Sequence, residues 1–461
     1  MNKTPLINRI YIWSVVLETL LFFVISDRLT AGIGGNVSRI LQGIVLIAIM
    51  LQYFIKPVGF WIKNIANQFY QNYLIYLGIA IIAGLVGVVS GSYESSVSLT
   101  SGQSYFANLL NSTAVRPIFE YVIAIYYFIY FIVLPCYMLK TEAALLNFFS
   151  VFRTMFIISL VVGFVDLAFA VGGINLVPRN IADWVYVGAR FHGLAGEPRE
   201  AFVYLFFGLA ILHLEAYMKK RSLNKFLVIA IIAAAIMTQS ASGLIGLAIF
   251  LGLYTIYSFT KAVNIRTIFL MIAIPTLVVT LIYVSIINSP RLTAYLESTS
   301  DLWFILESGN ELPIYMLMQS PNIYPLYDLT VKARELNILP ILIGSGLGSA
   351  SVINNQYSPH AGDLINPHSQ LVRTLFESGI VGTLFFIMSF VYPVKRLTKY
   401  IATRDRRIFM ILTLLLMGCF LGHRSAAPFI YLGLFFAAFQ FLLQVNKEAY
   451  TLMPANGLSG G

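Results

Sequence analysis

The sequence predicts an all-α fold, a polytopic transmembrane helix bundle of about twelve helices, and two observations lead to this prediction. Hydrophobic residues make up 58% of the 461 residues and charged residues only 11%, whereas a soluble domain carries nearer a quarter charged residues. The chain also contains repeated apolar runs whose length is close to the roughly 20 residues that one spanning helix needs. A chain of this composition cannot cover itself with a polar surface, so lipid must be its solvent.

The apolar runs divide the chain into spans that are joined mostly by short loops. The expected helices are 8–26, 38–55, 72–91, 116–139, 148–170, 199–218, 226–240, 243–259, 265–287, 370–394, 408–422 and 427–445. The seventh is short, so the pair around Ser240 could instead form a partly broken hairpin. With no repeat visible, the whole of 1–461 is expected to be a single integral membrane domain.

Basic residues are concentrated in loops on one side of the predicted bundle, most clearly from Lys395 to Arg407. Such loops mark the cytoplasmic side. The parity of the spans then places both termini in the cytoplasm. The net charge is +10, but it is spread over separate loops, which disfavours nucleic acid as a partner.

Long segments lie on the opposite, outer side. The largest is 288–369, expected to be a large loop on the outer face. Leu292 to Leu306 and Glu311 to Ile338 carry apolar residues at helical spacing, which is typical of amphipathic helices lying at the membrane interface. Ordered loops of this length usually carry function.

Charged and imidazole side chains fall at the predicted outer helix ends, and a charge at membrane depth tends to mark a pathway or site. These residues are Arg190, Arg199, Arg373, Arg424, His192, His368 and His423. Several arginines around one cavity would suit a pyrophosphate, because guanidinium offers paired donors to its oxygens. The arginines, together with His423, are therefore candidate substrate ligands. No His pair has the spacing of metal ligands on one helix, so neither a metal site nor a cofactor is expected.

Each arginine also has a simpler interpretation, as an interfacial residue or as half of a local ion pair. That interpretation is strong for Arg373, because Glu377 follows four residues later on the same helical face. It is equally strong for Arg116 and Glu120. It is weaker for Arg190 and Arg199, which bracket a glycine- and proline-containing segment with Glu197 between them.

His368 directly precedes a predicted helix, where an imidazole is either a cap or a group that can accept a proton from an attacking hydroxyl. The glycine-rich segment 344–348 reads Gly-Ser-Gly-Leu-Gly. It lacks the strand that a nucleotide-binding loop requires. It is therefore either a tight backbone turn or a plain flexible loop.

Several of these motifs, in this order, resemble the O-antigen polymerase and O-antigen ligase superfamily of membrane glycosyltransferases. Arg190-x-x-Gly193 is followed by Glu197-Pro198 at the start of a span, and a serine-rich turn follows at 240–243. The closest match is His368-Ser369-Gln370-Leu371 with Glu377 and two glycines in the next helix. The resemblance covers about 186–390.

Three positions depart from the family pattern. Ser369 stands where the family often has Asn after the His, Arg199 where it often has Asn after the Pro, and Ala241 where it often has Arg. Arg190 and His368 are therefore the best candidates for site residues that match the family pattern.

The resemblance implies a metal-independent, inverting transferase of the GT-C type that makes lipopolysaccharide O-antigen. It would lie in the inner (plasma) membrane of a bacterium, with 288–369 as a large periplasmic loop. The donor would be a growing glycan on undecaprenyl pyrophosphate, and the acceptor a sugar hydroxyl of one lipid-linked repeat unit at the periplasmic face. His368 would orient or deprotonate that hydroxyl, with Glu197 as a rival base and Arg190 beside the leaving pyrophosphate. The lipid bilayer is an expected partner, as are a chain-length regulator and a flippase of the same pathway.

Two alternatives stay open. A ligase would attach the same glycan to lipid A core and would share these motifs. A membrane transporter or flippase belongs to a different class, and it predicts discontinuous helices related by a repeat, with polar residues through the midplane.

Overall fold

In the computed structural model, all the regular secondary structure of the described residues is helical, with no strand among them. It describes residues 5–19, 37–55, 70–89, 115–174, 176–177, 190–195, 198–240, 323–357, 369–422 and 426–452, and the single positions 276, 280 and 367.

The predicted spans correspond to helices wherever the structure describes them. They are α1 (Leu6–Thr19), α3 (Val37–Ile55), α4 (Gln71–Val89), α6 (Arg116–Tyr127) continued by the π-helix η2 (Phe128–Val133) and α7 (Leu134–Met138), α8 (Glu142–Val171), α9 (Pro198–Met218), α10 (Lys225–Met237), α18 (Gln370–Leu397), α19 (Thr403–Gly422) and α20 (Ala427–Leu452). The range 243–259 lies outside the described residues, and so does 265–287 apart from 276 and 280.

Six of the described helices are long and apolar enough to cross a membrane, and α3 and α10 contribute shorter apolar stretches. The transmembrane character predicted from composition is therefore confirmed. The total of about twelve crossings, and the side on which each terminus lies, stay predictions.

Helix starts follow from local side-chain chemistry. The Thr141 hydroxyl accepts a hydrogen bond from the Ala144 amide at 3.3 Å and begins α8. Asn224 caps α10 in the same way through the Phe226 amide, at 2.9 Å. Such caps satisfy amide groups that a first helical turn leaves without a partner.

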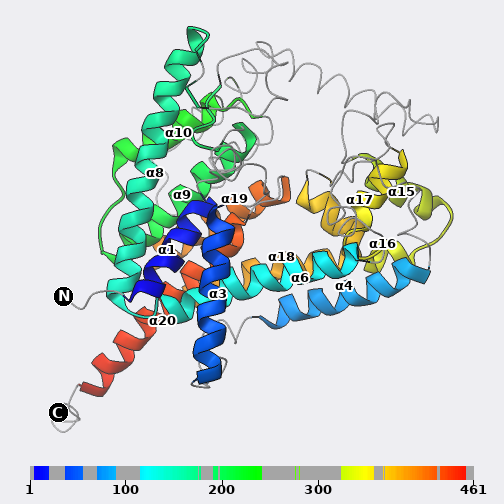
Figure 1. Ribbon diagram of the computed structural model, residues 1–461, viewed down its shortest axis with the longest axis horizontal. Helices are drawn as coiled ribbons and strands as arrows, with labels where there is room; N and C mark the ends of the chain where they lie inside the picture. The colour runs from blue at the N-terminus through cyan, green and yellow to red at the C-terminus, as the bar shows by residue number, and fades with distance from the viewer. Residues whose placement is uncertain are drawn as a thin grey trace.

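Helices α4, α6 and α18 run alongside one another toward the end of the molecule that carries the short helices α15 (Ile323–Arg334), α16 (Leu339–Ile343) and α17 (Ser349–Tyr357) (Figure 1). Only α15 falls inside the predicted amphipathic range Glu311 to Ile338. The range Leu292 to Leu306 lies outside the described residues.

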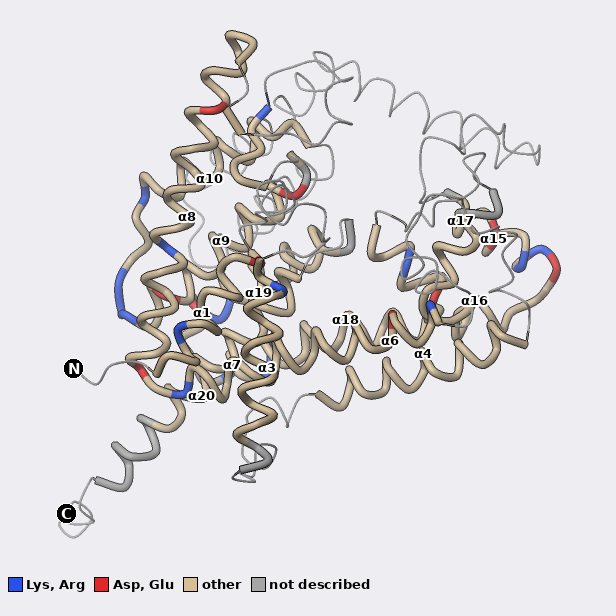
Figure 2. Tube along the Cα trace, in the orientation of Figure 1, with Lys and Arg blue, Asp and Glu red and all other residues tan. Residues whose placement is uncertain are grey.

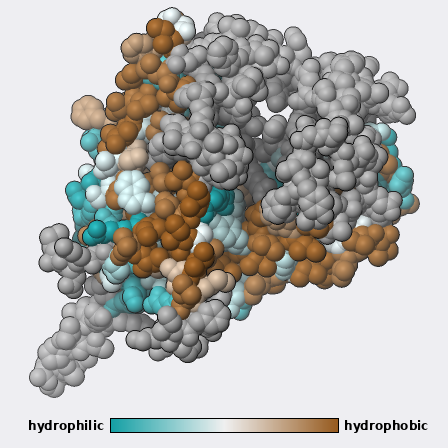
Figure 3. Space-filling model, in the orientation of Figure 1, coloured by the Kyte–Doolittle hydropathy of each residue, from teal (hydrophilic) through white to brown (hydrophobic). Residues whose placement is uncertain are grey.

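The outward face of α4 is apolar, with Leu85 64% and Val88 67% exposed. The space-filling view shows a continuous hydrophobic surface along this edge of the molecule (Figure 3). Helix α4 carries no charged residue along its length (Figure 2). Such a band suits contact with lipid tails.

Aromatic side chains fill the interior between α8 and α9. Phe152 stacks on Phe156 with ring centroids 5.8 Å apart and meets Phe207 edge-on at 5.5 Å. Gly208 lies directly beneath Phe156, so a side chain there would collide with the ring. Close aromatic packing of this kind fixes how the two helices sit against each other.

Candidate functional site

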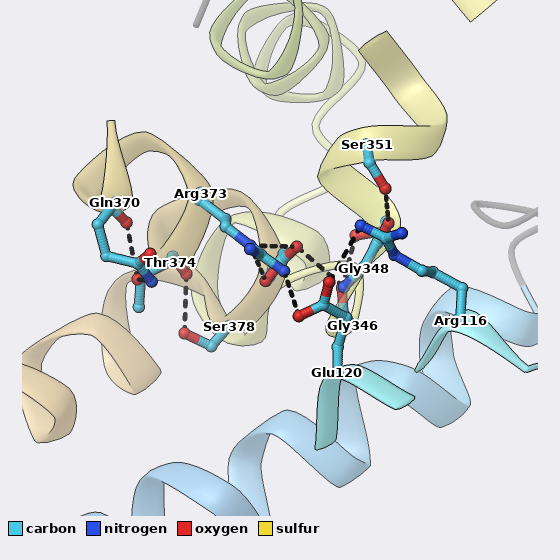
Figure 4. A network of polar contacts seen from close by, with 11 residues as sticks. Arg116, Glu120, Gly346, Gly348, Ser351, Gln370, Arg373, Thr374 and Ser378 are labelled. Carbon is cyan, nitrogen blue, oxygen red and sulfur yellow. Dashed lines mark hydrogen bonds and ion pairs between the residues drawn. The ribbon is translucent and has the colours of Figure 1, made fainter. Parts of the chain in front are cut away.

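A buried cluster of two arginines and two glutamates joins α6 to the first turns of α18 (Figure 4). Arg373 donates from Nε to both carboxylate oxygens of Glu377 at 3.1 Å and from Nη2 to Glu120 Oε2 at 2.8 Å. Arg116 reaches the other oxygen of Glu120 at 3.0 Å. Both ion pairs predicted at a spacing of four residues are confirmed, and the Arg373–Glu120 contact links them across two helices.

The cluster is almost completely removed from solvent. The side chains of Arg373, Glu120 and Arg116 are 3%, 5% and 9% exposed. Two positive and two negative charges balance, which the interior of a membrane protein requires. Removing one partner of a buried pair leaves an uncompensated charge and costs about 3–5 kcal/mol.

The glycine-rich segment 344–348 lies against this cluster and binds α18. The Gly348 amide donates to Glu377 Oε1 at 2.9 Å. The amides of Ser345 and Gly346 donate at 2.9 Å to the backbone carbonyls of Phe376 and Glu377. The three glycines have φ values of +90°, +94° and +83°, so the predicted tight backbone turn is confirmed.

A break in α18 makes room for this contact. Gly379 has φ 65° and ψ −174°, which is not helical, although helix continues on both sides. The break disturbs the hydrogen-bond ladder of the preceding turn, and the amides of 344–348 satisfy carbonyls there. A Cβ on Gly344 would overlap the backbone of Glu377, and one on Gly379 would overlap the backbone of Leu342. The two chain segments therefore cross in direct backbone contact.

A pocket of about 50 Å³ opens beside the cluster. Arg373, Gln370, Glu120 and Glu377 supply its polar wall. Its apolar wall is aromatic and comprises Tyr73, Tyr76, Tyr127, Phe386, Phe420 and Phe429. Within the described part of the chain, the buried atoms Arg373 Nη1 and Gln370 Oε1 have no hydrogen-bond partner.

A second polar cluster joins α1, α3 and α6 and reaches the pocket through Tyr127. Glu18 accepts from Ser38 at 2.6 Å and from Arg39 at 2.7 Å. Arg39 also donates to the Tyr127 hydroxyl at 3.2 Å. This cluster was not predicted, because its members lie far apart along the chain.

Arg190 binds the carboxyl end of α10. Its Nε donates to the Thr238 carbonyl at 2.9 Å and its Nη2 to the Gln239 carbonyl at 3.2 Å. A cation at a helix C-terminus is electrostatically favourable. Arg190 therefore has a structural role that was not predicted from the sequence. Replacing it would disturb this helix end in addition to any contact that it makes with a substrate.

His192 is fully buried, and its Nε2 lies 3.0 Å from Asp166 Oδ2 on α8. The other Asp166 oxygen accepts from the amides of Leu176 and Val177, each at 2.8 Å. Asp166 thus ties two loop segments to one helix. Asp166 was not among the predicted site residues, although its place as a carboxylate inside an apolar run was an available signal.

The remaining predicted site residues are His368, Glu197, His423, Arg424 and Arg199. The first four lie outside the described residues. Arg199 stands in the first turn of α9, but its side chain is not described. A joint site of His368 and Arg190 therefore stays a prediction.

The described residues contain no group of three or more His, Cys, Asp or Glu that could hold a metal ion. Comparison of the chain with family models, with curated proteins and with solved structures finds no match. Fold and geometry alone thus define the class: an all-helical membrane protein in which a glycine-rich segment is fastened to a broken helix by a buried, charge-balanced cluster.

Proposed function

We propose that this protein is a polymerase of lipid-linked surface polysaccharide, an inverting glycosyltransferase of the inner membrane that acts at the periplasmic face. One observation supports this best: the first turns of α18, which directly follow His368, are held rigidly. Ser369 caps the helix by accepting from the Val372 amide at 3.3 Å, and Arg373 anchors the next turn. A catalytic group needs this kind of support, because small misplacements cost large factors in rate.

In the proposed reaction the acceptor hydroxyl attacks the anomeric carbon of the donor glycan. A new glycosidic bond forms while the bond to undecaprenyl pyrophosphate breaks, with inversion, and the electron pair leaves on the pyrophosphate. His368 or Glu197 takes the hydroxyl proton. Arg190, Arg199, Arg424 and His423 are the proposed ligands of the departing charge, which donors placed in advance stabilise most effectively.

The ligase alternative uses the same donor and differs only in its acceptor, lipid A core. The transporter alternative gains two observations: α18 is interrupted at Gly379, and α6 continues into the π-helical segment η2. Interrupted helices often form transport sites. The interruption of α18 nevertheless has a local cause, because it receives the backbone of segment 344–348.

Purified protein in proteoliposomes, supplied with lipid-linked repeat units, separates the three functions. A polymerase produces a ladder of longer lipid-linked glycans from repeat units alone. A ligase produces a new product only when lipid A core is added. A transporter moves the repeat unit across the bilayer and leaves its length unchanged, and that result would contradict the proposal.

A further inference from the structure

We propose that the pocket beside Arg373 is a subsite for a neutral sugar hydroxyl group, bound between Arg373 Nη1 and Gln370 Oε1. The identity of the ligand rests on the proposed function, since a polysaccharide polymerase must hold sugar hydroxyls. The site itself rests on geometry.

The two open atoms are complementary in kind. Arg373 uses Nε and Nη2 on its glutamates, which leaves the Nη1 donor without a partner among the described residues. Gln370 donates from Nε2 to Thr374 Oγ1 at 2.9 Å, and its Oε1 acceptor has no hydrogen-bond partner among the described residues. Both side chains line one pocket. A hydroxyl can accept from the first and donate to the second, whereas an anion can only accept.

Charge also favours a neutral ligand. Glu120 and Glu377 line the pocket and already compensate Arg373 and Arg116. An added anion would leave excess negative charge in a buried place, which is costly. The structure therefore suggests a different role for Arg373 than the pyrophosphate contact expected from its residue type.

Size and lining fit one edge of a sugar. A space of about 50 Å³ holds a few water molecules or a small hydroxyl-bearing group. The walls opposite the polar atoms are aromatic, including Tyr73, Phe386 and Phe429. Tyr73 and Tyr127 have their hydroxyls engaged elsewhere, with Ala124 and with Arg39.

Saturation-transfer NMR on the full-length protein in phosphatidylethanolamine–phosphatidylglycerol nanodiscs tests this inference. The probes are the methyl glycosides of glucose, galactose and mannose, with inorganic phosphate as the anionic competitor. At least one glycoside should bind the wild type. Binding should weaken about tenfold or more in Arg373→Lys and in Gln370→Leu, as expected for loss of a hydrogen bond to a buried partner.

The matched control is Arg396→Lys, the same substitution at an exposed position of α18, and it should bind as the wild type does. Gln370→Leu spares the ion pairs and should fold normally, with an unchanged melting temperature. The inference is overturned if no glycoside binds, if both variants bind normally, or if phosphate displaces the glycoside.

Polymerisation is measured separately on the same preparations. If the wild type makes a ladder and glycoside binding is unchanged in both variants, the subsite is refuted and the proposed function stands. Binding that depends on both residues, without any ladder, would support the subsite as a hydroxyl site and refute the polymerase.

Discussion

Replacing Arg373 and Glu377 singly and together with glutamine measures how strongly the buried cluster holds the fold. The change Glu377→Gln leaves two arginines facing one glutamate in a nearly solvent-free site. The change Arg373→Gln leaves the Glu377 carboxylate with the Gly348 amide as its one hydrogen-bond partner among the described residues. Each single variant should lower the free energy of unfolding by about 3–5 kcal/mol.

The double variant removes one charge of each sign and keeps the Arg116–Glu120 pair, which lies 3.0 Å apart. It should therefore be less damaging than the sum of the single variants, by about 1–3 kcal/mol. Unfolding in mixed micelles of dodecylmaltoside and dodecyl sulfate, followed by circular dichroism, gives all four free energies. Arg396→Gln is the exposed control on the same helix and should have little effect. Additive effects, or single variants as stable as the wild type, would refute the cluster as described.

Three further predictions test other parts of the account. Gly344→Ala should sharply reduce the yield of folded protein, because the new methyl group overlaps backbone at a φ of +90°, whereas Gly418→Ala, with open space at its Cβ, should not; fluorescence-detected size exclusion measures both. Asp166→Ala should lower the thermal midpoint, since two loop amides bound at 2.8 Å lose their acceptor and the buried one, that of Val177, costs about 1–3 kcal/mol when left without a partner; an unchanged midpoint would show that the loops are held by other contacts. A cysteine placed near Asn310 should react with a membrane-impermeant maleimide from outside, while one near Arg404 should not, and the reverse pattern would overturn the predicted topology.

The sequence predicted features that depend on neighbours along the chain. The spacing of Arg373 and Glu377 on one helical face was enough to predict their ion pair. The glycines of 344–348 indicated a tight turn as one of two interpretations, and the structure shows that one. The start of α18 at Gln370 followed from the apolar pattern and its flanking polar residues.

Contacts between distant segments could not be predicted in this way. Nothing in the local sequence indicates that Glu120 on α6 would bind Arg373, or that Arg190 would bind carbonyls beyond α10. These contacts depend on how helices pack, and packing is decided by shape across the whole bundle. The break at Gly379 depends on the same packing, because its cause is a backbone segment that arrives from earlier in the chain.

The most direct test of the proposed function is the product ladder made by His368→Ala. His368 is preferred to Arg190 for this purpose, because Arg190 also holds the end of α10. Wild-type protein should extend lipid-linked repeat units into a ladder. The variant, inserted and folded at the same level, should extend them about 10²–10⁴ times more slowly, the usual contribution of a general base. A normal ladder from His368→Ala would transfer the role of base to Glu197, and the absence of any ladder from the wild type would contradict the polymerase itself.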